Sequence, residues 1–237
     1  IGIDPFTYFL SMTRLASIQC VLPSHPVTTG ISTIDYFISS EMEEPMEAVF
    51  HYTEKLILLK DIPVCYTKPI QPPPLNRIQL GLPEEENLYL CPMALFKIHP
   101  SFDTALDQIL SQDPHAKILF FKYGNTLLHQ ILEQRFQQTI PQNAHRIHFL
   151  PWASGQRFLS IISQVDVVLD PFHFSGGNTA YLVLATGTPM VTWASPYQRG
   201  RMCYGHYRRM RFLECVAETP EDYVQIALQL GKEKEHL

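Results

Sequence analysis

The chain has 237 residues, of which 46% are hydrophobic and 17% are charged, and this composition is typical of a globular protein with a sizeable core. Its formal net charge of −5 at pH 7 argues against a nucleic-acid-binding surface, which needs an excess of Lys and Arg. No apolar run in the sequence approaches the roughly 18 residues that a membrane-spanning helix requires.

The five cysteines are spread along the chain without a Cys-x-x-Cys pair, and the ten histidines form no His-Glu-x-x-His motif. An odd number of dispersed cysteines is typical of reduced thiols in a cytoplasmic protein. The spacing of Cys and His also predicts no structural metal site. Because the chain begins with Ile1 rather than Met, we expect it to be part of a longer protein.

Residues 1–66 contain three stretches with strand-like composition, at 18–22, 35–39 and 55–59. Three strands with one or two helices are too few for a complete α/β domain, so we expect this segment to be the C-terminal part of one. The next segment, 67–86, is rich in proline, which removes backbone donors and fixes φ. We predict that it is an irregular linker. Its prolines are Pro69, Pro72, Pro73, Pro74 and Pro83.

From residue 87 onward, strand-like runs alternate with segments of helical periodicity. Six strands are predicted, at 88–92, 117–123, 146–150, 165–170, 190–193 and 214–216. A helix at 125–138 follows Asn125, which can cap its free amides, and Thr219-Pro220 begins another helix. Strands separated by helices are typical of βαβ units. The predicted fold class is therefore α/β, with a Rossmann-like doubly wound parallel sheet over residues 87–237.

The most informative local pattern follows the strand at 165–170. A glycine-rich loop with Gly176 and Gly177 leads into a helix through Asn178 and Thr179. Glycines let backbone amides approach a ligand closely, and the free amides and partial positive charge of a helix N-terminus suit a phosphate. A tight strand-to-helix turn capped by Asn or Thr explains the same residues equally well. A nicotinamide dinucleotide is disfavoured, because the sequence contains no Gly-x-Gly-x-x-Gly.

Five stretches of the chain resemble, in the same order, the catalytic region of the O-linked N-acetylglucosamine transferases, including their SPINDLY-like and bacterial members. The stretches are SHPVTTG, IDYFISSEMEEPMEAVFHYTEKLILL, LFKIHPSFD, SGGNTAYLVLATGTPMVT and ASPYQRGRMCYGHYRRM. The resemblance extends over nearly the whole chain. It implies a GT-B glycosyltransferase, in which the second of two facing Rossmann-like domains holds the nucleotide-sugar. Residues 1–66 would then end the acceptor-side domain, and 87–237 would form the nucleotide-sugar-binding domain.

The resemblance also implies residues that bind the donor diphosphate. By position, Lys97 matches the lysine of this family that reaches the diphosphate. An exposed lysine at a strand–helix junction is the alternative interpretation, and we favour the diphosphate role. The phosphate-binding loop would comprise Gly176, Gly177, Asn178 and Thr179.

Three further positions would contact the nucleoside. Ala153 matches a position whose backbone reads the uracil edge, and Phe158 matches a ring that packs on the base, although a phenylalanine on this helix is equally expected in a core. Leu182 stands where the family usually has a carboxylate that holds the ribose hydroxyls. Leucine cannot accept those hydrogen bonds, which indicates altered ribose recognition. His25 is a candidate catalytic residue and His173 a candidate phosphate donor, and a structural role in a turn explains either one. No general base is predicted.

The resemblance implies an inverting, metal-independent transfer of N-acetylglucosamine or a hexose from a UDP-sugar to Ser, Thr or Asn of a polypeptide. We therefore expect a UDP-sugar and a polypeptide acceptor as partners, no cofactor, and possible helical repeats upstream in the full-length protein. Asp166 and Asp170 are too far apart for the Asp-x-Asp metal clamp of other glycosyltransferases, and we expect them to orient the strand. The alternative function, raised by Leu182, is a catalytically inactive nucleotide-sugar-binding or protein-interaction module.

Overall fold

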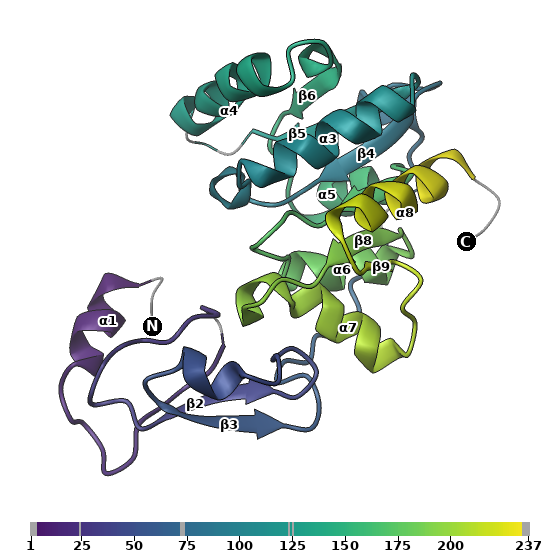
Figure 1. Ribbon diagram of the computed structural model, residues 1–237. Coiled ribbons are helices and arrows are strands. Elements are labelled where there is room, and N and C mark those ends of the chain that lie inside the picture. The colour runs from purple at the N-terminus through teal and green to yellow at the C-terminus, as the bar shows by residue number, and fades with distance from the viewer. Residues whose placement is uncertain (1–3, 24, 72–73, 123, 125, 234–237) are drawn as a thin grey trace. The chain divides into compact units, whose positions relative to one another are not determined.

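The computed structural model describes residues 4–23, 25–71, 74–122, 124 and 126–233 (Figure 1). The chain divides into two compact units. The first unit comprises Ile1–Tyr66 and Ser195–Leu213, and the second unit comprises Thr67–Ala194 and Glu214–Leu237. None of the helices in the described ranges combines the length and apolar character that crossing a bilayer requires.

The second unit is built around a six-stranded sheet in which every neighbouring pair of strands is parallel. The strands are β4 (Asn87–Cys91), β5 (Ala116–Phe121), β6 (Ile147–Leu150), β7 (Val167–Leu169), β8 (Met190–Trp193) and β9 (Val216–Ala217). Their order in the sheet is β6-β5-β4-β7-β8-β9. Counted along the chain from β4, this is the order 3-2-1-4-5-6 of doubly wound nucleotide-binding folds. The predicted α/β fold class and all six predicted strands are confirmed.

Helices cover both faces of this sheet. They are α3 (Ser101–Gln112), α4 (Thr126–Thr139), α5 (Gly155–Ile162), α6 (Asn178–Thr186) and α8 (Pro220–Lys232). Figure 1 shows α3 and α8 side by side on one face, and α5 packs against α6. The predicted start of α8 is confirmed, because Pro220 occupies its first turn and Thr219 accepts a hydrogen bond from the amide of Asp222. The cap predicted at Asn125 lies outside the described residues.

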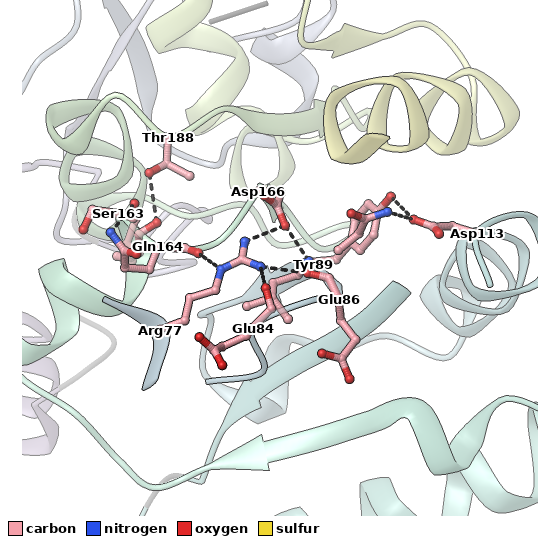
Figure 2. Close-up of polar contacts among 12 residues, drawn as sticks. Arg77, Glu84, Glu86, Tyr89, Asp113, Ser163, Gln164, Asp166 and Thr188 are labelled. Carbon is pink, nitrogen blue, oxygen red and sulfur yellow. Dashed lines mark hydrogen bonds and ion pairs between the residues drawn. The ribbon is translucent and has the colours of Figure 1, made fainter. Parts of the chain in front are cut away.

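Part of the predicted linker, 67–86, is regular structure. Asn76 and Gln79 form a reciprocal capping box that starts the short helix α2 (Arg77–Leu80), which ends at Gly81 with φ of 73°. The guanidinium of Arg77 then donates to the carbonyl oxygens of Gln164 and Glu86 and to the carboxylate of Asp166, at 2.8 to 2.9 Å (Figure 2). The expectation of a wholly irregular linker is therefore wrong, because local capping and one arginine fix this stretch to the second unit.

The first unit contains a smaller parallel sheet, in the order β1-β2-β3. Its strands are β1 (Cys20–Val21), β2 (Tyr36–Ser40) and β3 (Lys55–Leu59), and its helix α1 spans Pro5–Ser11. The three strands predicted in this part of the chain are confirmed. The apolar core consists of Val21, Ile31, Ile34 and Phe37.

Residues 195–213 belong to the first unit, although the sequence predicted them to be part of the domain at 87–237. They contain the 3-10 helix η4 (Gln198–Gly200) and helix α7 (Met202–Met210). The side chain of Gln198 donates to the Glu43 carboxylate at 2.9 Å, and Arg201 donates to the Glu43 carbonyl oxygen at 2.7 Å. These long-range bonds to Glu43, just after β2, are the reason that residues 195–213 belong to the first unit rather than to the predicted domain.

Candidate functional site

The strand order defines one place where a ligand is expected in the second unit. From β4 the chain turns to β5 on one side, whereas β7 lies on the other side of β4. In such sheets, ligands bind outside the carboxyl ends of the two strands at which the order reverses. The segments leaving these ends are 92–98 after β4 and 170–177 after β7. The candidate phosphate-binding residues lie on these two segments and on the first turn of α6.

The two segments contact each other directly. The ammonium of Lys97 donates to the carbonyl oxygen of Ser175 at 3.2 Å. Gly176 lies so close to Met93 that a Cβ at position 176 would overlap the terminal methyl of the methionine. Lys97 and the glycine-rich loop, 80 residues apart in sequence, are thus neighbours at the carboxyl end of β4.

Lys97 is the last residue of the 3-10 helix η2 (Leu95–Lys97), and its side chain is half-buried. Besides the bond to Ser175, its ammonium lies 4.1 Å from the centre of the Phe174 ring, a cation–π contact. Burial lowers the pKa of Lys97, and the nearby carboxylate of Asp170 acts in the opposite direction. An anion would relieve the cost of burying this charge.

Asp170 organises the loop. It is only 2% exposed and accepts three hydrogen bonds, from the hydroxyls of Ser175 (2.6 Å) and Thr192 (2.7 Å) and from the amide of Gly176 (2.8 Å). Burial raises the pKa of this carboxyl, and the hydrogen bonds oppose that effect. The expectation that Asp170 orients the chain at the end of the strand is confirmed. Asp166 does so at the other end of β7, where it accepts a bond from the amide of Leu88.

Helix α6 begins at the end of the glycine-rich loop, as the sequence predicts. Gly177 is its N-terminal cap residue, and Asn178 and Thr179 form its first turn. The first amides of an α-helix have no acceptor within the helix and carry its partial positive charge. The helix ends at Gly187, whose φ of 80° is the left-handed conformation that favours glycine. This arrangement can bind an anion between the start of α6 and Lys97.

The candidate nucleoside-binding residues lie on the segment that follows β6 and on two helices. Ala153 is buried between β6 and α5. Phe158, on α5, is 8% exposed, and its ring packs 5.4 Å from that of Phe121, which is the environment of a core residue. Leu182 lies half-buried on α6. Base and ribose binding by these residues stays a prediction.

His25, the candidate catalytic residue, lies in the first unit and is half-buried. Its carbonyl oxygen accepts a hydrogen bond from the amide of Val27 at 2.9 Å, which is the geometry of a tight turn. Its unit differs from that of the other candidate residues, and its catalytic role stays a prediction. Within the described ranges, no three His, Cys, Asp or Glu side chains gather closely enough to hold a metal ion.

Sequence reasoning missed two features of the second unit. The hydroxyls of Ser175 and Thr192 meet on Asp170, although 17 residues separate them in sequence. The side chains of His99, Ser101 and His173 also form one hydrogen-bonded group. The short spacing of Asp170 and Ser175 gave a local signal for the first feature. Nothing local signalled the second, because it depends on how β4 and β7 pair.

Comparison with known proteins identifies the class to which this fold and site belong. Residues 70–237 match the Glycosyl transferase family 41, and the chain belongs to that family. A Thermobaculum terrenum O-GlcNAc transferase mutant is similar in structure, with a TM-score of 0.77 and 25% sequence identity over 92% of this chain and 41% of the other. The fold is accordingly that of the GT-B glycosyltransferases.

Two relatives are similar over almost the entire chain. A probable UDP-N-acetylglucosamine–peptide N-acetylglucosaminyltransferase SPINDLY of Solanum lycopersicum is 26% identical over 93% of this chain. A UDP-glucose:protein N-beta-glucosyltransferase of Actinobacillus pleuropneumoniae serotype 7 is 27% identical over 98% of it. The chain spans only 24% and 37% of the lengths of these two relatives.

Proposed function

We propose that the second unit binds the nucleoside diphosphate of a UDP-sugar, and that the protein containing it transfers the sugar to a polypeptide. The observation that carries the proposal is the contact between Lys97 and the loop that opens α6, at the point where the strand order reverses. Fixed N–H donors and a half-buried ammonium at such a point suit a diphosphate. Both relatives are named as enzymes that transfer a sugar from a UDP-sugar to a peptide or protein. These names support the same ligand class.

The chemistry that fits this site is inverting displacement at the anomeric carbon. The acceptor, a Ser or Thr hydroxyl or an Asn amide nitrogen, attacks that carbon while UDP leaves. Negative charge then develops on the diphosphate, and donors that are already in place stabilise it without reorganisation. The ammonium of Lys97, the hydroxyl of Thr179 and the amides at 177–179 are the proposed donors.

We propose that no divalent metal takes part in donor binding. In metal-dependent transferases a cation neutralises the diphosphate, whereas here the ammonium of Lys97 and the N-terminus of α6 supply positive charge at the same place. Asp170 is unsuited to be a metal ligand, because its two oxygens already accept three hydrogen bonds.

The two relatives differ in sugar and in linkage, so we limit the donor to UDP-N-acetylglucosamine or a UDP-hexose. The half-buried Leu182 favours a second candidate function. A side chain without an acceptor at the proposed ribose position leaves the ribose hydroxyls unpaired there. A chain that keeps the diphosphate site but holds the ribose weakly fits a nucleotide-sugar-binding or protein-interaction module without transferase activity.

The transfer reaction is proposed for the whole protein, because the chain spans less than half of each relative. Within it, we propose that the first unit belongs to the acceptor side and contributes His25. Helical repeats upstream and a cytoplasmic location belong to the same proposal. Radiolabelled UDP-sugar and polypeptide acceptors test it, and transfer by the full-length protein that is lost in Lys97→Ala is the expected result. An active Lys97→Ala variant would contradict the proposed site.

A further inference from the structure

Two histidines and one serine form a hydrogen-bonded group beside the glycine-rich loop. Ser101 is the first residue of α3, His99 precedes it by two positions, and His173 lies in the loop after β7. The Ser101 hydroxyl oxygen is 2.8 Å from Nδ1 of His99 and 3.2 Å from Nε2 of His173. The centres of the two imidazole rings are 5.0 Å apart. The Ser101 hydroxyl therefore links the start of α3 to the loop after β7. This is a second link between the chain that follows β4 and that loop, besides the bond between Lys97 and Ser175.

The geometry fixes the direction of these bonds. The backbone amide of Ser101 donates to Nδ1 of His99 at 3.2 Å, so that nitrogen is an acceptor and the proton of a neutral His99 is on Nε2. The Ser101 hydroxyl then donates to the same Nδ1, and its oxygen accepts the Nε2 proton of His173. The donation runs from His173 through Ser101 to His99.

His173 has a backbone conformation that needs support. Its φ is 72°, the left-handed region that costs free energy for a residue with a Cβ. Residues held in such conformations persist only where their surroundings fix them, and they concentrate at ligand-binding sites. The bond to Ser101 supports it, as does the Trp193 ring, whose centre lies 5.9 Å from that of the imidazole.

The conformation of His173 sets the path of the residues that follow it. Phe174 is the ring that faces the ammonium of Lys97, and Ser175 gives its carbonyl to Lys97 and its hydroxyl to Asp170. We propose that His173 is a positioning residue of the donor loop, held in its left-handed conformation by His99 through Ser101. This inference rests on the proposed function, because it assigns the group to the loop that receives the diphosphate.

Ser101→Ala tests the inference, with Ser101→Thr as the variant that keeps the hydroxyl. Ser111→Ala at the other end of α3 is the matched control, because the Ser111 hydroxyl accepts a hydrogen bond from the Asn143 side chain. If the loop of Ser101→Ala adopts the UDP-binding conformation about a third of the time, the Kd for UDP rises about threefold. We expect that rise in Ser101→Ala, and an unchanged Kd in Ser101→Thr and in Ser111→Ala.

Nitrogen-15 NMR provides a readout that does not depend on UDP. It should find the proton of the neutral His99 ring on Nε2. The amide signals of Phe174 and Ser175 should move in Ser101→Ala and stay in place in Ser101→Thr. A His99 proton on Nδ1, or amide signals that are unchanged in Ser101→Ala, would overturn the inference. Absence of UDP binding by the unaltered protein would instead contradict the proposed function, and the NMR result would still decide the role of His173 in the loop.

Discussion

The amide of Gly176 donates to the carboxylate of Asp170 across a distance of 2.8 Å. This bond turns the glycine-rich loop back over the end of β7, so that the chain enters α6 beside Lys97. A buried carboxylate thus fixes the backbone of a loop that is proposed to receive another anion. The contribution of Asp170 to stability can be measured with Asp170→Ala and Asp170→Asn, because these two substitutions separate the charge of the carboxylate from its hydrogen bonds.

Asp170→Ala is expected to lower the free energy of unfolding by about 2–4 kcal/mol, because three donors lose their acceptor inside the protein. Asp170→Asn keeps the shape, and its amide oxygen and NH2 group can pair with Gly176 and with the two hydroxyls of Ser175 and Thr192. It should cost less than half as much. Urea unfolding of both variants measures the difference. Equal losses would mean that the charge, and not the hydrogen bonds, is what the loop requires.

The stability of the unaltered protein should depend on pH in a way that the stability of Asp170→Asn does not. Burial raises the pKa of Asp170 in the folded protein, so folding favours its protonated form. The corresponding stability is present below the unfolded pKa, about 3.9, and is lost as the pH rises through the folded value. The free energy of unfolding of the unaltered protein should therefore fall relative to that of Asp170→Asn as the pH rises above about 4. A difference that stays constant as the pH rises would contradict the raised pKa.

Leu182→Glu tests the ribose position. If Leu182 faces the ribose, a carboxylate there regains hydrogen bonds worth about 1.5 kcal/mol, or about a tenfold tighter Kd for UDP. The gain should be much smaller for 2′-deoxy-UDP and absent in Leu182→Met, which adds no acceptor. Calorimetric titrations of the two ligands provide the measurement. Equal responses of UDP and 2′-deoxy-UDP would show that position 182 does not face the ribose.

Gly205→Ala tests the assignment of α7 to the first unit. In an exposed helix this change would stabilise the protein by up to about 1 kcal/mol. Here the new Cβ would lie 2.6 Å from Cγ of the buried Glu43, so we expect a destabilisation of about 1–3 kcal/mol. In a Glu43→Ala background the cost should largely disappear, and a double-mutant cycle of unfolding free energies measures this coupling. Additive effects would contradict the contact.

The strands were predictable because their residues carry the pattern themselves. Buried parallel strands such as β5 read as continuous apolar runs, and Gly187 marks the end of α6 by a local conformational need. The position of residues 195–213 was not predictable, since bonds between Gln198 or Arg201 and the distant Glu43 determine it.

The candidate site divides in the same way. The glycine-rich start of α6 is visible in the sequence, and Lys97 follows from the family resemblance. The role of Asp170 as a triple acceptor is complete only when Thr192 on β8 lies beside the end of β7. The role of Ser101 as a link between two histidines arises only when the ends of β4 and β7 are neighbours. Phe158 carries too little information, because a phenylalanine on a helix has the same pattern whether it packs in a core or on a base.

Calorimetric titration of UDP into the unaltered chain and into Lys97→Ala, with EDTA present, tests the central claim most directly. The account predicts that the unaltered chain binds UDP without added metal and that Lys97→Ala weakens binding by about 1.5–3 kcal/mol, the scale of a charge-assisted hydrogen bond. Lys232→Ala is the matched control, because that ammonium donates to the carbonyl of Gln112 at the far end of α3, and it should bind UDP like the unaltered chain. Unchanged affinity in Lys97→Ala, or binding that appears only after Mg²⁺ or Mn²⁺ is supplied, would contradict the account.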